Sequence, residues 1–208
     1  MLEQKQEEET KLDFQECLNY TLAKIKECDI TEDPFPYLLI QEIFTPPLYK
    51  QILIELVQLK SWDSFHKPSK KKGNPKRKQI CICDDMVGKF IQKSSVYDIE
   101  AQIQSQNEFK KEMEHYPALK IMNFILVSLE LKTLLLNQFY SYQKQRYKPH
   151  DIPSLTKHIE INSDTSEFYM SPHTDTTTKL IFGIFYLAAD ETQKHLSTNL
   201  FRHKNDLK

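Results

Sequence analysis

A histidine and an aspartate two residues apart are the side chains of this chain best suited by type and spacing to do chemistry. His173 and Asp175 lie in residues 168–187, whose sequence is FYMSPHTDTTTKLIFGIFYL. Strand side chains alternate between two faces, so a strand here would put the imidazole and the carboxylate on the same face. Such a pair supplies two of the three ligands of the 2-His-1-carboxylate triad that holds Fe(II). The spacing therefore predicts a metal site at His173 and Asp175.

The surroundings of the motif separate it from a similar one. Residues 158–160, His-Ile-Glu, have nearly the same form, and an H-x-D tripeptide by itself is common by chance. Only His173 follows a Ser-Pro dipeptide, which would end a strand, and precedes a long apolar run. The alternative interpretation is a turn in which Asp175 and Thr176 hydrogen-bond the local backbone.

The stretch after the motif also favours a strand. Residues 180–187 are almost wholly apolar and β-branched or aromatic, which predicts a strand buried inside a barrel. With His173, Asp175 and Lys179 before it and a Tyr-Leu pair at its end, this arrangement resembles the metal-binding core of the Fe(II)/2-oxoglutarate-dependent dioxygenases, prolyl-hydroxylase-like branch.

The resemblance reaches beyond the core. Residues 189–201 are similar to the next loop and strand of that branch, with Ser197 where the branch often has glycine, and residues 33–40 are similar to its opening strand. It thus covers most of the chain.

The resemblance implies an enzyme that hydroxylates an unidentified substrate while 2-oxoglutarate is decarboxylated to succinate. Fe(II) would be the cofactor and 2-oxoglutarate the cosubstrate. His173 and Asp175 would be metal ligands, and Tyr186 and Lys179 would contact the cosubstrate. The alternatives are a core tyrosine at Tyr186 and a solvated lysine at Lys179.

One part of the family pattern has no counterpart. The family has a third ligand, a distal histidine, followed by an arginine or lysine that pairs with the cosubstrate carboxylate. His195 and His203 follow the H-x-D too closely to fill the distal position. We therefore expect a C-terminally truncated dioxygenase whose own activity is doubtful. A truncated, inactive homologue that serves as a binding or regulatory module, and an unrelated α+β protein with a chance H-x-D, are the alternatives.

The predicted fold class is α+β, with N-terminal helices packed on a partial double-stranded β-helix, or jelly roll. We expect one incomplete domain over residues 1–208, mainly helical with an early strand over 1–145 and with the first jelly-roll strands over 146–208. The periodicity of apolar residues and the breaking prolines predict the elements. Helices are expected over residues 1–28, from Thr45 onward, over 96–107 and over 108–140 with a break near Pro117; strands are expected over 35–44, 79–83 and 157–161.

The long helical region should bury one apolar stripe against the rest of the domain. Its expected members are Leu119, Met122, Ile125, Leu126, Leu129 and Leu136.

Charge argues against a general nucleic-acid-binding surface, because the net charge is −1. Residues 67–78 are locally very basic but rich in breakers and contain no aromatic residue for base stacking, so a solvated loop is expected there. The alternative is a contact with nucleic acid or an acidic partner, or a nuclear-import signal.

The cysteines and the N-terminal stretch indicate the cellular compartment. The four cysteines lack disulfide-scaffold spacing. Cys81 and Cys83 would face the same way on a strand, but a zinc site would need two further ligands and none is adjacent along the chain, so packing is expected. Residues 1–12 form a charged run unlike a secretory signal or a membrane anchor, and no transmembrane span is expected. We therefore expect a cytoplasmic protein.

Overall fold

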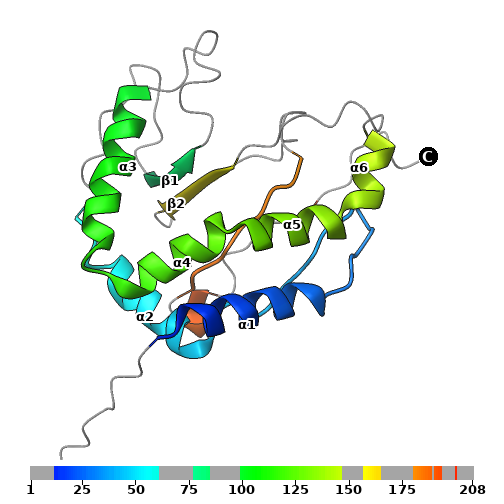
Figure 1. Cartoon of the computed structure of the whole chain (residues 1–208), viewed down its shortest axis with the longest axis horizontal. Coiled ribbons are helices and arrows are strands. Elements are labelled where there is room, and N and C mark those ends of the chain that lie inside the picture. The colour runs from blue at the N-terminus through cyan, green and yellow to red at the C-terminus, as the bar shows by residue number, and fades with distance from the viewer. Residues whose placement is uncertain are drawn as a thin grey trace, which may run out of the picture.

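The computed structural model describes residues 12–60, 77–84, 99–146, 157–164, 180–188, 190–193 and 200 (Figure 1). For parts of the elements near residues 77–84 and 99–105 it describes the backbone alone. The elements are α1 (Phe14–Lys26), α2 (Pro46–Leu56), β1 (Arg77–Asp84), α3 (Ile99–Met113), α4 (Pro117–Val127), α5 (Leu129–Gln138), α6 (Tyr140–Arg146), β2 (His158–Asp164) and the 3-10 turn η2 (Glu191–Gln193).

Helix α1 confirms the predicted helix over residues 14–26, whereas Leu12 and Asp13, which the prediction placed inside the helix, precede it. The side chain of Asp13 accepts a hydrogen bond from the backbone N–H of Glu16 at 2.8 Å, which caps the first turn. One face is buried and the other carries charge, as the periodicity predicted. The buried residues are Cys17, Leu18, Thr21 and Ile25. Residues 1–11 of the predicted helix lie outside the described residues.

Helix α2 begins where the sequence indicates, with proline in its first turn directly after Thr45. Thr45 occupies the N-cap position, but its side chain makes no capping hydrogen bond. Its Oγ1 lies 3.7 Å from the Sγ of Cys17 on α1 instead. The hydroxyl of Thr45 therefore contacts the neighbouring helix and does not cap α2.

The predicted break near Pro117 is confirmed, and a second break follows. Pro117 begins α4, and Ser128 separates α4 from α5. The Oγ of Ser128 accepts from the N–H of Leu131 at 3.2 Å and so starts the new helix. Of the predicted stripe, Leu119, Met122 and Ile125 are buried and Leu126 packs against the core.

The predicted burial of Leu129 is wrong, because this residue is 70% exposed. The predicted apolar stripe requires one continuous helix. Because the helix breaks at Ser128, the apolar residues of α5 do not continue the buried stripe of α4. Leu136 is partly buried on the new helix.

Glu55 joins α2 to α4. Its side chain is 2% exposed, and its carboxylate accepts the backbone N–H groups of Ala118 and Leu119 at 3.2 and 2.8 Å. These N–H groups belong to the first turn of α4, where no intrahelical acceptor exists. A buried carboxylate on another helix therefore supplies the hydrogen-bond acceptors for the N–H groups at the N-terminus of α4.

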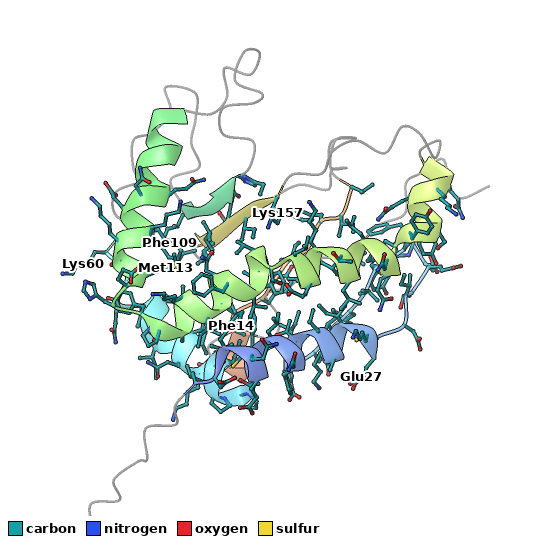
Figure 2. All side chains as sticks on the ribbon, viewed as in Figure 1. Phe14, Glu27, Lys60, Phe109, Met113 and Lys157 are labelled. Carbon is teal, nitrogen blue, oxygen red and sulfur yellow. The ribbon has the colours of Figure 1, made fainter. Side chains whose placement is uncertain are left out.

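The strands β1 and β2 form an antiparallel pair, which confirms the strands predicted over 79–83 and 157–161. Ile80 is opposite Ile161, and both side chains are buried in the same core as α4. Helix α3 packs against β1, with Phe109 and Met113 buried on its inner side (Figure 2). Helices α4 and α5 lie between α1 and the β pair (Figure 1).

The register corrects the prediction that Cys81 and Cys83 share a face. Cys81 is opposite Glu160 and Cys83 is opposite Ile159, with a bulge between them that leaves Ile82 without a register partner. The extra residue breaks the period of two, so the two cysteines occupy positions on opposite faces.

Two predicted strands are absent from the described structure. Residues 35–44 contain no strand, only an isolated bridge from Tyr37 to Thr31. Residues 180–187 are neither helix nor strand, and Phe182 and Ile184 are exposed. A short apolar run does not specify a strand unless a partner strand supplies hydrogen bonds and cover.

The described chain is therefore a mixed, mainly helical structure with N-terminal helices and one two-stranded sheet, and these residues do not show a jelly roll. No helix within the described ranges is long and apolar enough to cross a bilayer.

We expect Glu55→Ala to lower the free energy of unfolding by about 2–4 kcal/mol, because two N–H groups at the start of α4 lose a charged acceptor. Glu55→Gln keeps one side-chain oxygen and should lose about 1–2 kcal/mol. Urea unfolding followed by circular dichroism measures both.

The matched control is Glu114→Ala. This exposed carboxylate pairs with Lys120 at 3.1 Å on the surface, and its loss should change stability by less than about 0.5 kcal/mol. Equal losses in Glu55→Ala and Glu114→Ala would contradict the role of Glu55.

Candidate functional site

The predicted metal ligands are not part of the described structure. His173, Asp175 and Lys179 all lie between residues 164 and 180, outside the described residues. The structure does describe the strand that precedes this stretch, β2, and the segment that follows it, residues 180–188. The structure therefore describes the candidate site through β2 on one side of it and residues 180–188 on the other, which we call its two flanks.

The segment after the motif is held against the helices. The hydroxyl of Tyr49 on α2 donates a hydrogen bond to the carbonyl of Ala188 at 2.7 Å. The rings of Phe44 and Phe185 stack with centroids 6.1 Å apart and an interplanar angle of 20°. Leu187 packs against the core. Residues at the end of the apolar run are thus anchored at the start of α2.

Tyr186 does not lie in the interior that the sequence predicted. Its residue surface is 50% exposed, and its neighbours Ile184 and Phe185 are 49% and 41% exposed. The expected burial is therefore wrong for these described residues, which keep between two fifths and half of their surface exposed. A hydroxyl on an exposed ring is still able to contact a bound carboxylate, and that role remains a prediction.

The second histidine motif forms a side-chain pair on β2. The Nε2 of His158 lies 2.6 Å from the Oε1 of Glu160, and the side chains are 43% and 22% exposed. Ile159 and Ile161, which alternate with them, face the core. His158 and Glu160 therefore lie on the face of β2 opposite its buried isoleucines, and both keep some accessible side-chain surface.

Within the described residues no group of three His, Cys, Asp or Glu side chains converges closely enough to hold a metal ion. The predicted ligands His173 and Asp175 lie outside these residues.

A shallow apolar groove runs between α1 and the start of α4 and α5, with a volume of about 720 Å³. Phe14 and Phe124 form its wall in an edge-to-face contact with centroids 6.0 Å apart. Lys120 and Glu130 are the charged residues that line it. No local sequence pattern indicates this groove, because it forms only where helices distant in sequence pack together.

Comparison with known proteins adds no assignment: no family model, curated protein or solved structure matches the chain. The function has to be argued from the residues and from the geometry of the described flanks.

We expect Tyr49→Phe to lower the free energy of unfolding by about 1 kcal/mol at neutral pH, because the carbonyl of Ala188 loses its donor. The control is Tyr140→Phe, on a half-exposed ring beside Lys144, which should change stability by less than about 0.5 kcal/mol. Urea unfolding of the three proteins measures the difference.

The same hydroxyl should make part of the stability pH-dependent. Burial raises the pKa of Tyr49 in the folded chain. The contribution of the Tyr49 hydroxyl to the free energy of unfolding is therefore complete below the ordinary tyrosine pKa of about 10. It is lost as the pH rises through the raised pKa of the folded state. We expect the stability gap between wild type and Tyr49→Phe to narrow at alkaline pH; a constant gap would contradict the buried hydroxyl.

Proposed function

We propose that this chain belongs to an Fe(II)/2-oxoglutarate-dependent dioxygenase that hydroxylates an unidentified substrate, with His173 and Asp175 as two of the iron ligands. The observation that carries the proposal is the order of residues in one stretch. A Ser-Pro dipeptide precedes the H-x-D, and Lys179 and a long apolar run ending in Tyr-Leu follow it.

The described flanks support this proposal. The strand β2 precedes the H-x-D along the chain, pairs with β1 and packs its isoleucine face against the helices. Residues 185–188 after the motif return to the start of α2 through the Tyr49 hydrogen bond and the stack on Phe44. In the proposed jelly roll, β1 and β2 are two strands of a sheet whose outer face the helices cover.

The donor set suits Fe(II) in type. A neutral imidazole and a carboxylate are the ligands of the non-haem Fe(II) sites. His173 and Asp175 are two donors, and we assign no third. Iron and 2-oxoglutarate, when bound, would supply the oxidising chemistry, and the chain's residues would hold and orient them.

Two further residues are proposed to bind the cosubstrate. The ammonium of Lys179 and the hydroxyl of Tyr186 offer a cation and a hydrogen-bond donor to the carboxylate of 2-oxoglutarate that does not bind the metal. Both follow the H-x-D within the same stretch, so they are expected at the same mouth of the site.

We also propose a cytoplasmic location. The cysteine spacing is not that of a disulfide scaffold, and the reducing cytoplasm keeps thiols free and iron in the ferrous state.

An anaerobic titration of the full chain with Fe(II) and 2-oxoglutarate tests the assignment. The cosubstrate chelated to iron gives a visible charge-transfer band, which we expect in the wild type. His173→Ala and Asp175→Ala should each abolish the band because each removes one ligand. His195→Ala and His203→Ala then show whether either histidine supplies a third.

The matched control is His158→Ala, which removes the histidine of the similar motif on β2 and should keep the band. Circular dichroism verifies that every variant is folded. A folded wild type without the band would overturn the proposal and favour a binding or regulatory module. A band that survives in both His173→Ala and Asp175→Ala would overturn the ligand assignment.

A further inference from the structure

The groove between α1 and α4 leaves two aromatic rings in contact with solvent. Phe14 and Phe124 form its wall through their edge-to-face contact, yet these residues are 38% and 47% exposed. Figure 2 shows Phe14 where α1 lies beside α4. Leu18, Ile121 and Val127 add further apolar lining. Exposed aromatic rings gathered in one groove are typical of a binding surface, because covering them removes apolar area from water.

Two residues of opposite charge line the groove at different points along its length. Lys120 precedes Phe124 on α4, and Glu130 follows it at the start of α5. Helices α4 and α5 follow one another in nearly the same direction (Figure 1). At the rise of an α-helix, the two charges are about 15 Å apart along these helices. The groove therefore has a positive end, an apolar middle and a negative end.

Both charges are accessible from solvent. The side chain of Lys120 is 42% exposed, and its ammonium pairs with the exposed carboxylate of Glu114 at 3.1 Å. Since an ammonium has three N–H donors, Lys120 can bind a second carboxylate without losing Glu114. Glu130 is exposed and has no cationic partner among the described residues. Each end of the groove can thus form an ion pair with another molecule.

We propose that this groove binds the same groove of a second copy of the chain, so that two chains form a dimer about a two-fold axis near Phe124. In such an isologous contact one surface meets itself, and the two copies of α4 run antiparallel. The positive end of one groove then faces the negative end of the other.

Charge complementarity selects this occupant. In the antiparallel arrangement Lys120 meets Glu130 of the second copy, and Glu130 meets Lys120 of the second copy, so the contact contains two equivalent ion pairs. The rings of Phe14 and Phe124 are covered between them. A parallel arrangement would place like charges together, which is unfavourable. The dimer involves none of the proposed iron ligands and does not rest on the proposed dioxygenase function.

Sedimentation velocity of the full chain over a hundredfold range of concentration tests the proposal. We expect the wild type to shift from monomer to dimer as the concentration rises. Phe124→Asp should stay monomeric, because dimerisation would bury an unpaired charge in the apolar middle of the groove. The control is Lys50→Glu, an exposed position on α2 outside the groove, which should dimerise as the wild type does.

Charge reversal tests the antiparallel arrangement. Lys120→Glu and Glu130→Lys each place like charges opposite one another at both ends of the dimer, so each should weaken dimerisation about tenfold or more. An equimolar mixture of these two variants should regain the dimer, because every contact between the two different chains again joins opposite charges. The double variant Lys120→Glu/Glu130→Lys should regain it for the same reason. Circular dichroism verifies that every variant is folded.

Three outcomes would overturn the proposal. The first is a wild type that stays monomeric at every concentration, which would leave residues 1–11, preceding Phe14, or another protein as the occupant of the groove. The second is a dimer that persists unchanged in Phe124→Asp. The third is a mixture of Lys120→Glu and Glu130→Lys that dimerises no better than either variant alone.

Discussion

The arrangement of this chain depends on a buried carboxylate at the N-terminus of a central helix. Glu55 on α2 accepts hydrogen bonds from the backbone N–H groups of Ala118 and Leu119. These groups lie in the first turn of α4, which begins at Pro117, and have no intrahelical acceptor. A helix that begins in the interior has to have these groups satisfied, because an unpaired buried N–H is costly. The positive end of the helix dipole adds to the attraction for a carboxylate. This contact fixes the position of α4 relative to α2.

Both flanks of the candidate iron site follow from the position of α4. On one side, the isoleucines of β1 and β2 share its core, so the strand before the H-x-D has a defined buried face. On the other side, Tyr49 and Phe44 at the start of α2 hold the segment after the H-x-D. The helical layer thereby fixes where the chain enters and leaves the stretch with His173 and Asp175.

The register of the β pair shows how tertiary pairing brings together residues that are remote in sequence. Cys81 and Glu160 are remote in the chain and become neighbours only through the register of the ladder. The bulge at Ile82 adds Asp84 to the same face, since it changes which residues alternate.

Local physical chemistry allowed the sequence by itself to determine most of the helices. Prolines at 46 and 117 and the helical period of apolar residues act within a few residues, so α2 and α4 begin where the sequence predicts and α1 lies inside its longer predicted range. The H-x-D and its context were likewise visible without a structure. Only the tertiary structure decided the rest: the break at Ser128 and the exposure of Leu129, the irregular path of residues 180–187, the groove at Phe14 and the register of β1 on β2. Each of these depends on contacts between residues far apart in the chain, which no local pattern of side chains specifies.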